Sequence, residues 1–342
     1  MLAGGEGTRL RPLTYTTPKP LLPIANRPFL EHQLSWLARH GVDEVVLSLG
    51  YRPDAFARRF ESGTYDGVRL RYAVEPEPLG TAGAIRFAAH HHAGDGQGVS
   101  GRFLVCNGDV LTDLDVSALV RFHDERGAQA SIALTRVEDP SAFGVVPTDE
   151  NGRVQSFVEK PPPGQAPTDW INAGTYVLEA SVLDAIPAGR PVSIERETFP
   201  GLLAADGQLY AMRSPDYWVD IGTPVKYLQA NVDMLAGRIA GDRPTLGVAL
   251  VGSGSRVAPE AEVTESVVGP GVEVGEGAKI IRSVLLEGVR VAPGAEVVDS
   301  VIGPGALVGP GALISGTSVV GPGADVPAGA RLIGARVEAV AR

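Results

Sequence analysis

Residues 2–11 read Leu2-Ala-Gly-Gly-Glu-Gly-Thr-Arg-Leu-Arg11, and a second segment, Thr17-Pro-Lys-Pro-Leu-Leu-Pro23, follows closely. The three glycines leave a turn without β-carbons, so its backbone N–H groups can approach an anion closely. The two arginines that follow suit bidentate contact with phosphate oxygens. Lys19 lies between two prolines, which largely set the backbone around it. Together the two segments predict a polyphosphate-binding loop.

This loop is neither a Walker A loop nor a Gly-x-Gly-x-x-Gly dinucleotide fingerprint. Its full string resembles the signature of the sugar-1-phosphate nucleotidyltransferases, Gly-Gly-x-Gly-Thr-Arg-Leu-x-Pro-Leu-Thr with Pro-Lys-Pro downstream. Within that family the chain is most similar to mannose-1-phosphate guanylyltransferases of the long bacterial type. The resemblance implies catalytic roles for Arg9 and Lys19. It implies nucleotide contacts at Leu2, Ala3, Gly4, Gly5, Gly7, Thr8 and Arg9.

The bulk composition narrows the class of protein. A chain of 342 residues can form two domains, and its net charge of −10 argues against nucleic acid as a partner. The single cysteine, Cys106, excludes an internal disulfide and a metal site built from cysteines. No apolar run approaches 18 residues and no signal peptide is recognisable, so we expect a cytoplasmic protein without a membrane partner.

The first two thirds of the chain alternate between helical and strand patterns. We predict helices over 28–40, 54–60, 81–89 and 116–126, and strands over 45–49, 68–74, 103–106 and 130–136. This rhythm indicates an α/β domain, residues 1–238, with a Rossmann-like, mostly parallel sheet whose ligands bind at the carboxyl ends of the strands. A buried strand normally precedes a Gly-rich phosphate loop, yet only Met1, Leu2 and Ala3 precede Gly4, so we expect the natural start to lie upstream.

The last third of the chain carries a hexapeptide repeat. Aliphatic residues recur every six positions at Ile302, Val308, Ile314, Val320 and Val326, and earlier triplets show the same step with slips of five. This period predicts a left-handed parallel β-helix over residues 248–336, after a linker over 239–247. A disordered Gly/Pro-rich tail would not keep aliphatics in register. We expect the β-helix to serve a homo-oligomer. An acyltransferase role would need a histidine between coils, and none follows His123.

A segment that follows a predicted strand, Glu75-Pro-Glu-Pro-Leu-Gly-Thr-Ala-Gly-Ala84, also resembles the guanylyltransferase branch. The carboxylate of Glu75 can accept two hydrogen bonds, and the Watson–Crick edge of guanine offers two donors, which predicts GTP as the nucleotide. Glu77 is the expected bystander. Gly80 would let the flat base lie against the backbone, and Thr81 is predicted to join the nucleotide contacts. The alternative is that Glu75 is a solvated loop carboxylate.

Two aspartates are candidate metal ligands. Leu104-Val-Cys-Asn-Gly-Asp109 brings a hydrophobic strand to a carboxylate, and Tyr217-Trp-Val-Asp-Ile-Gly-Thr223 supplies a second one at Asp220. An Asp before or after a Gly is often only a turn former or a helix cap. Together, Asp109 and Asp220 resemble the two metal-ligating aspartates of the family and are predicted to be catalytic ligands of Mg²⁺, with Asp109 also contacting the nucleotide.

The predicted sugar-phosphate side lies further along the chain. Phe143-Gly-Val-Val146, Phe157-Val-Glu-Lys-Pro161 and Ile171-Asn-Ala-Gly-Thr-Tyr176 match segments of the family. The resemblance implies that Lys160 pairs with the phosphate and that Gly144, Glu159, Asn172 and Thr175 contact the hexose. Ser193-Ile-Glu-Arg-Glu197 resembles another guanylyltransferase segment, in which Glu195 would be a further sugar contact.

The implied reaction joins a sugar 1-phosphate, most plausibly mannose 1-phosphate, to GTP and releases pyrophosphate by in-line attack at the α-phosphorus. Four alternatives stay open. The enzyme could transfer a thymidylyl, uridylyl or adenylyl group to glucose 1-phosphate, or take a modified or carbocyclic sugar phosphate. From a different class, the chain could be a non-catalytic regulatory subunit, although Arg9, Lys19, Asp109 and Asp220 are all present.

Overall fold

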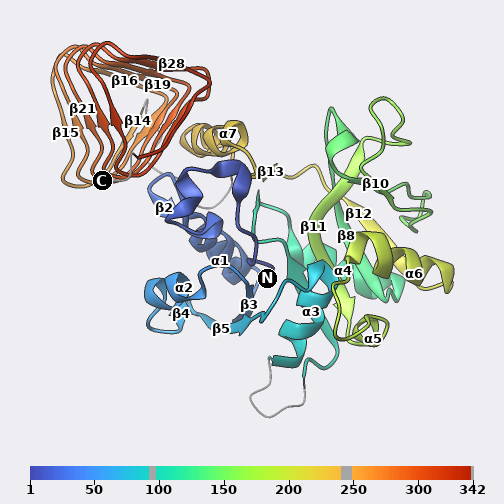
Figure 1. Ribbon diagram of the computed structural model, residues 1–342. Helices are drawn as coiled ribbons and strands as arrows, with labels where there is room; N and C mark the ends of the chain where they lie inside the picture. Colours follow the sequence, from blue (N-terminus) through green and yellow to red (C-terminus); the bar gives the residue numbers. More distant parts are fainter. Residues whose placement is uncertain (92–97, 240–248, 340–342) are drawn as a thin grey trace. The chain divides into compact units, whose positions relative to one another are not determined.

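The computed structural model describes residues 1–91, 98–239 and 249–339, and Figure 1 traces the chain through them. Contacts divide the chain into two compact units whose sequences interleave. The first unit comprises Met1–Gly5 and Gln33–Trp218, and the second comprises Glu6–His32 and Val219–Arg342. The sequence-based division at residues 238 and 248 stays a prediction, and most of the predicted linker (240–247) lies outside the described residues.

The larger sheet of the first unit has the strand order β10-β9-β11-β8-β12, and β6 also pairs with β11. The long strand β11 (Trp170–Glu179) runs antiparallel to both β6 (Arg102–Cys106) and β8 (Ala130–Arg136). Strand β12 (Leu209–Arg213) runs parallel to β8. The two short strands β9 (Gly144–Val145) and β10 (Val158–Glu159) form an antiparallel pair at the sheet edge.

A smaller sheet in the same unit has the order β3-β5-β4. Strands β3 (Glu44–Leu49) and β5 (Val68–Val74) are parallel, and β4 (Thr64–Tyr65) is antiparallel to β5. Residues 1–3 lie between the two sheets, because Leu2 forms parallel bridges to both Ser48 and Asn107. The first residues of the chain therefore connect the sheets and bring Gly4 to the ends of their strands.

The helices of the first unit are α2 (Pro53–Arg59), α3 (Gly80–His91), α4 (Val116–Arg126), α5 (Ser181–Asp184) and α6 (Phe199–Ala204), and α1 (Phe29–Arg39) begins in the second unit. None of the described helices is long and apolar enough to cross a membrane. All eight elements predicted between residues 28 and 136 are confirmed within two residues of their expected ends. The structure refines the sheet, which is mixed because β11 enters antiparallel to its neighbours.

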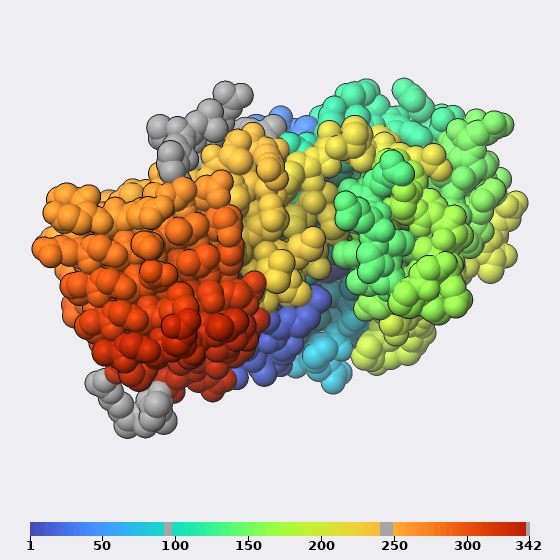
Figure 2. All heavy atoms as spheres, turned by 90° about the horizontal axis from the view of Figure 1, so that it is seen from above, coloured from blue at the N-terminus to red at the C-terminus, as the bar shows by residue number. Residues whose placement is uncertain are grey.

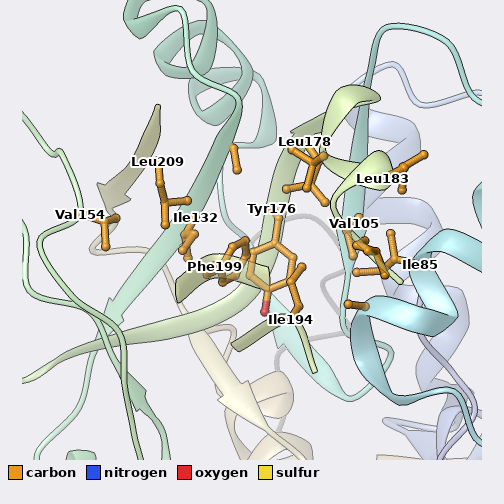
Figure 3. Packing of buried hydrophobic residues seen from close by; sticks show 14 of the residues in the cluster. Ile85, Val105, Ile132, Val154, Tyr176, Leu178, Leu183, Ile194, Phe199 and Leu209 are labelled. Atoms are coloured by element: carbon orange, nitrogen blue, oxygen red, sulfur yellow. The ribbon is translucent and has the colours of Figure 1, made fainter. Parts of the chain in front are cut away.

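A buried hydrophobic cluster fills the first unit between its larger sheet and the surrounding helices. Tyr176 on β11 is fully buried at the centre of the cluster (Figure 3). Its ring meets the ring of Phe199 edge to face, with centroids 5.3 Å apart. Figure 3 also shows Ile194 beside this pair, so a side chain from the loop before α6 closes the cluster. The cluster thus holds β11 and the segment near residue 194 together.

The second unit contains the parallel β-helix. Its three sheets have the orders β14-β17-β20-β23-β26-β29, β15-β18-β21-β24-β27 and β16-β19-β22-β25-β28, and every pairing is parallel. The strands run from β14 (Ala249–Val251) to β29 (Arg336–Val337), two or three residues each. In Figure 2 the colour passes from orange to red across this module as the coils stack in chain order. The predicted β-helix is confirmed, and its hexapeptide sides are consistent with left-handed winding.

The repeating aliphatics point inward as predicted. Ile302, Val308, Ile314, Val320 and Val326 are all buried in one continuous cluster. In the first coils the equivalent residues are 17 apart, as Val267 pairs with Val284 and Val284 pairs with Val301. Two sides of each such coil therefore advance by six residues and one side by five, which explains the slips in the sequence pattern.

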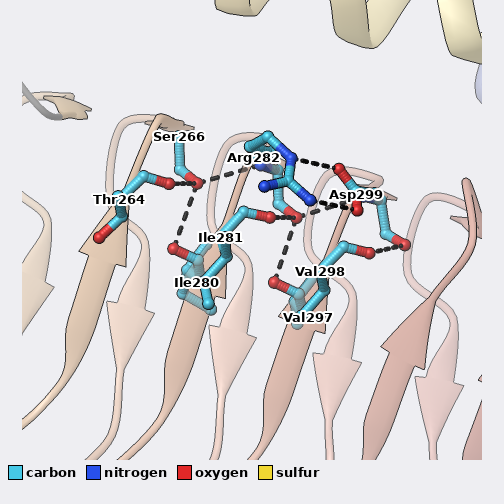
Figure 4. Close-up of polar contacts among 10 residues, drawn as sticks. Thr264, Ser266, Ile280, Ile281, Arg282, Val297, Val298 and Asp299 are labelled. Carbon is cyan, nitrogen blue, oxygen red and sulfur yellow. Dashed lines mark hydrogen bonds and ion pairs between the residues drawn. The ribbon is translucent and has the colours of Figure 1, made fainter.

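One corner of the β-helix carries buried serines, which the sequence analysis did not single out (Figure 4). Ser266, Ser283, Ser300 and Ser318 are at most 1 % exposed. The Ser283 hydroxyl donates to the Ile281 carbonyl at 2.8 Å and accepts from the Ser300 N–H at 3.2 Å. Each serine thus satisfies backbone groups of its own coil and of the next one, where burial would otherwise be costly.

The second unit also contains the arm formed by residues 6–32, with strands β1 (Pro23–Ile24) and β2 (Arg27–Pro28), and helix α7 (Pro224–Leu235). Asn231 on α7 accepts a hydrogen bond from the Ala25 N–H at 2.9 Å. Asn26 donates to the Val268 carbonyl of the β-helix at 2.8 Å. The arm that carries the signature therefore packs against both α7 and the β-helix.

Candidate active site

The signature arm is shaped by close packing around Gly7. Gly7 has φ +64°, and a β-carbon there would lie 3.0 Å from Thr14 Cγ2 and 3.1 Å from Lys19 Cβ. The Thr14 hydroxyl donates to the Gly7 carbonyl at 2.9 Å. Because the conformation favours glycine and the space is filled, Gly7 brings the stem of Lys19 against the turn. The two signature segments are thereby joined as the sequence predicted.

Three charged groups of the second unit converge at Gly222. Lys19 is buried, and its Nζ lies 3.6 Å from Asp220 Oδ1. A β-carbon at Gly222 would lie 2.5 Å from an Arg9 guanidinium nitrogen and 2.9 Å from Asp220 Oδ1. The absence of a side chain at 222 therefore leaves room for two cations and one carboxylate. A buried ammonium requires a charged or hydrogen-bonding partner, and Asp220 supplies one.

Arg11 lies outside this group. Its guanidinium pairs with Glu6 at 2.9 Å and stands 5.2 Å from the centre of the Tyr15 ring. The Tyr15 hydroxyl in turn donates to Glu338 of the β-helix at 3.0 Å. Of the two arginines in the signature, only Arg9 lies beside Lys19 and Asp220.

In the first unit, Glu75 faces the start of the signature turn. A β-carbon at Gly4 would lie 3.4 Å from Glu75 Oε1. That oxygen accepts from the Ser48 hydroxyl at 2.8 Å, and Oε2 accepts from the Leu79 N–H at 3.2 Å. Each carboxylate oxygen can accept more than one hydrogen bond, so a ligand can still be recognised. Ser48 is a supporting residue that the sequence did not indicate.

Asp109 is held at the carboxyl end of β6 by the residues before it. The Asn107 N–H donates to the Gly174 carbonyl, and the Gly108 N–H donates to the Leu2 carbonyl, both at 2.8 Å. A β-carbon at Gly108 would lie 2.5 Å from the Leu2 oxygen, so this close approach requires glycine. The turn is clamped between Leu2 and β11, and it presents the half-buried Asp109 just beyond the strand.

The two aspartates are a plausible chemical match for magnesium. Within residues 1–91, 98–239 and 249–339, no group of three or more His, Cys, Asp or Glu side chains forms a ready metal cage. Mg²⁺ commonly takes one or two carboxylates and completes its octahedron with water and substrate phosphates. Asp109 and Asp220 provide such carboxylates, one in each unit, and Asp220 lies among phosphate-type cations.

The predicted sugar residues Gly144, Glu159 and Lys160 lie close together on the β9–β10 pair. Glu159 pairs with Gly144 in register, and a β-carbon at Gly144 would lie 3.0 Å from Glu159 Oε2. Lys160 has φ +52°, and its exposed ammonium lies 3.6 Å from Glu159 Oε1. A left-handed backbone at lysine is uncommon and turns the chain sharply after the glutamate.

The predictions for Asn172 and Thr175 have different outcomes. The Asn172 amide donates to the Tyr176 hydroxyl at 2.7 Å and its oxygen accepts from the Gly174 N–H at 2.9 Å. Thr175 is only 2 % exposed and faces Cys106, whose thiol pKa is raised by burial to about 12. Asn172 thus sits at the edge of a polar group around Tyr176. The burial of Thr175 argues against its side chain as a sugar contact.

The structure gives Gly80 and Thr81 partners inside the protein. A β-carbon at Gly80 would lie 2.6 Å from the Val192 carbonyl oxygen, and Gly80 has φ +69°. The Thr81 hydroxyl donates to Glu195 Oε2 at 3.0 Å. Close packing of Val192 therefore explains the glycine without a ligand. The predicted nucleotide contacts at both residues remain predictions.

Comparison with known proteins agrees with this arrangement. The family described as Nucleotidyl transferase matches residues 1–237, which is more than half of the chain. The chain belongs to the nucleotidyl transferase family. A second family, described as GMPPB C-terminal domain, matches residues 245–339, which include the described coils of the β-helix. Enzymes of the nucleotidyltransferase family generally use a divalent metal ion.

Among curated relatives, this nucleotidyltransferase is 44 % identical to mannose-1-phosphate guanylyltransferase of Mycobacterium tuberculosis, covering 84 % of the chain and 79 % of the relative. It is 40 % identical to probable mannose-1-phosphate guanylyltransferase 3 of Oryza sativa subsp. japonica, covering 84 % and 78 %. Among solved structures, it is similar to HddC from Yersinia pseudotuberculosis complexed with GMP-PN. That match has 31 % identity and a TM-score of 0.57, and it covers 67 % of this chain and 96 % of HddC.

Proposed function

We propose that this nucleotidyltransferase converts mannose 1-phosphate and GTP to GDP-mannose and pyrophosphate. A phosphate oxygen of the sugar phosphate forms a bond to the α-phosphorus of GTP. The bond from that phosphorus to the β-phosphate oxygen breaks in line, and its electron pair leaves with pyrophosphate. No enzyme nucleophile is needed, so catalysis consists of positioning and charge stabilisation.

The observation that carries the choice of nucleotide is the Glu75 carboxylate beside Gly4. Its two oxygens suit the N1–H and 2-amino donors of guanine, whereas adenine offers an acceptor at N1. Ser48 and the Leu79 N–H orient the carboxylate, which lowers the entropy lost when a base binds. The guanylyltransferase names of the relatives support the same nucleotide.

In the proposed mechanism, Arg9 holds the departing pyrophosphate and Lys19 stabilises charge on the reacting phosphates. Their convergence at Gly222 supports these roles, because two cations there can contact neighbouring phosphate oxygens. Asp109 and Asp220 would hold Mg²⁺. When bound, the ion supplies positive charge to the oxygens of both substrates. The predicted backbone contacts of Leu2, Ala3, Gly4, Gly5, Gly7 and Thr8 with the nucleotide belong to this proposal.

For the sugar, we propose that Glu159 accepts from hexose hydroxyls and that Lys160 pairs with the sugar phosphate. Their proximity on β10, with Gly144 opposite, supports a common subsite. Mannose and glucose differ at one hydroxyl, so the sugar is the finest part of the proposal. Glucose 1-phosphate with dTTP, UTP or ATP, a modified or carbocyclic sugar phosphate, and a regulatory subunit are the alternatives to be tested.

We further propose a cytoplasmic location, because nucleoside triphosphates and sugar phosphates are intracellular metabolites. We also propose a homo-oligomer that associates through the β-helix. Light scattering of the purified chain at several concentrations would test this assembly. A monomeric mass throughout would contradict it.

The function is tested by pyrophosphate release from purified protein with Mg²⁺. GTP, ATP, UTP and dTTP are each paired with mannose 1-phosphate and glucose 1-phosphate, and EDTA is the control. We expect the highest kcat/KM with GTP and mannose 1-phosphate. Turnover with dTTP or UTP instead would contradict the role of Glu75. Silence with all pairs would favour the regulatory subunit or an unusual sugar phosphate.

The nucleotide choice is then tested by Glu75→Gln. The amide replaces one acceptor with a donor, so kcat/KM for GTP should fall about tenfold or more, the effect of a hydrogen bond to a charged group. Glu77→Gln is the matched control, because Glu77 is exposed two residues away. An equal loss in both variants, or no loss in either, would refute base recognition by Glu75.

A further inference from the structure

The start of α3 is bonded to the segment before the turn at residues 194–198. The Ala82 N–H donates to the Val192 carbonyl at 2.9 Å, and the Val192 N–H donates to the Leu79 carbonyl at 2.8 Å. These contacts join two segments about 110 residues apart in the chain, a separation close to that of the printed Thr81–Glu195 pair (114). A segment predicted to contact the nucleotide is thereby fixed to one on the sugar side.

Thr81 is the polar centre of this junction. Its hydroxyl donates to Glu195 Oε2 at 3.0 Å and accepts from the Ile194 N–H at 2.8 Å. The Ser193 hydroxyl donates to the same carboxylate oxygen at 2.9 Å. Among the described residues, the hydrogen bonds of the Glu195 carboxylate end on Oε2. Two hydroxyls therefore orient the group and leave Oε1 to accept from a ligand.

The Glu195 carboxylate lies toward the polar group around Tyr176. Burial is the main cause that raises the pKa of the Tyr176 hydroxyl, and the negative charges of Glu195, Asp109 and Glu159 add to it. Figure 3 shows Tyr176 beside Ile194, the residue that precedes Glu195. Glu195 thus shares its surroundings with Glu159, the predicted acceptor for hexose hydroxyls.

The local backbone is unusual at this point. Ile194–Thr198 forms a single turn of π-helix, a rare conformation that often occurs at functional sites. Ser193 caps the turn by accepting from the Arg196 N–H at 3.2 Å. The other acidic residue of the turn, Glu197, instead pairs with Arg190 at 2.7 Å in solvent. The turn therefore directs one carboxylate inward and one outward.

We propose that Thr81 is a positioning residue for the sugar subsite, which holds Glu195 so that the free carboxylate oxygen accepts a hydrogen bond from a hexose hydroxyl. This inference rests on the proposed function, and it gives Thr81 a role other than binding the nucleotide. Glu195 is then a specificity-determining residue, since a carboxylate in a fixed position distinguishes sugars by the direction of one hydroxyl. The nucleotide helix and the sugar acceptor form one unit.

The experiment measures KM for each substrate separately in Thr81→Val, Thr81→Ser and Glu195→Gln. Valine keeps the shape of threonine and removes the hydroxyl, whereas serine keeps the hydroxyl. We expect Thr81→Val and Glu195→Gln each to raise KM for mannose 1-phosphate about tenfold, with KM for GTP unchanged within about twofold. Thr81→Ser should restore the wild-type value. The double variant should lose little more than either single variant, because both act on one interaction.

Glu197→Gln is the matched control from the same turn and should behave as wild type. A rise in KM for GTP alone in Thr81→Val would overturn the proposal and make Thr81 a nucleotide ligand. Unchanged KM values in both Thr81→Val and Glu195→Gln would also overturn it. If Thr81→Val does not fold, Ser193→Ala with Glu195→Gln provides the same comparison.

The wild-type panel separates this test from that of the proposed function. If another nucleotide and sugar pair turns over, the proposed function fails and the same KM comparison is made with that pair. If no pair turns over, calorimetry of mannose 1-phosphate and glucose 1-phosphate binding to wild type, Thr81→Val and Glu195→Gln replaces kinetics. Equal dissociation constants for both sugars in all three proteins would then refute the inference.

Discussion

The β-helix and the nucleotidyltransferase site are stabilised by contacts of very different range. In the β-helix, the Ser300 N–H bonds to Ser283, 17 residues earlier, and the same step recurs along the corner. In the site, Thr81 bonds to Glu195, 114 residues away. The first kind of contact repeats and can be read from a period. The second kind occurs once, and its members carry no common pattern.

This difference predicts where a substitution is felt. A coil contacts mainly its two neighbours, so a defect there should lower local stability and leave chemistry intact. The site depends on single groups that act on charge in the transition state, so a defect there should reduce rate and leave the coils intact. Three predictions test that separation, in order of decreasing effect.

The largest effect is expected for Lys19→Met. The methionine keeps the apolar stem and removes the ammonium beside Asp220, so kcat/KM should fall about 10²- to 10³-fold, the range seen for single charge-stabilising donors. Pyrophosphate release measures the loss, and amide exchange in the coils should match wild type. Lys226→Met on the exposed face of α7 is the control. A variant with more than a fifth of wild-type kcat/KM would show that Lys19 is structural.

The second prediction concerns Ile302→Ala in the β-helix core. Ile302 is fully buried, so the cavity should cost about 3 kcal/mol of stability, measured by amide exchange of neighbouring coils in the full chain. Turnover at 25 °C should change less than twofold. Leu307→Ala is the control, because Leu307 is 40 % exposed on the next strand. Equal losses in the two variants, or a large loss of turnover with the coils intact, would refute the separation.

The third prediction concerns pH and His32. Burial lowers the pKa of His32 to about 4, and the nearby Arg27 charge adds to this, although a ring nitrogen bonds to the Ile24 carbonyl at 2.9 Å. Above pH 6.5 the ring is neutral in both folded and unfolded chains. As pH falls from 6.5 to 4, only the unfolded chain gains the proton, so stability should decrease by on the order of 2–3 kcal/mol.

Amide exchange over residues 24–32 measures this loss, and His32→Gln, which has no titrating ring, should remove most of it. The coils contain no histidine, since none follows His123 in the sequence, so their exchange should depend less on pH over the same interval. An unchanged pH dependence in His32→Gln would assign the effect to other groups.

The sequence predicted those parts of the protein that repeat or lie in one segment. The coils followed from aliphatics six apart, and the N-cap of α4 followed from Asp115, which accepts from the Ala118 N–H at 2.9 Å. The signature turn was likewise recognisable, because its glycines and cations are contiguous. In each case the residues that must meet are neighbours in the chain or are separated by a constant step.

The remainder depended on contacts between distant segments. The antiparallel entry of β11 was not predicted, because a buried apolar strand looks alike in either direction. Thr175 was expected at the sugar, yet its pairing with Cys106 turns it into the core. The partners of Thr81 could not be inferred either, since nothing in its own segment indicates Glu195. The serine corner did have a signal, a serine every 17 or 18 residues, which the aliphatic period obscured.

The serine corner also sets a unit of length for the module. Each serine joins its own coil to the next at a separation of 17 residues, so the bonding pattern closes only over whole coils. Duplication or deletion of 17 residues, such as 283–299, would present the same donors and acceptors at both new junctions. A change of one or two residues would leave a buried amide facing the wrong group. The module can therefore lengthen or shorten in evolution in complete coils, and its height is quantised by genetic events of about 51 nucleotides, three for each residue of a coil.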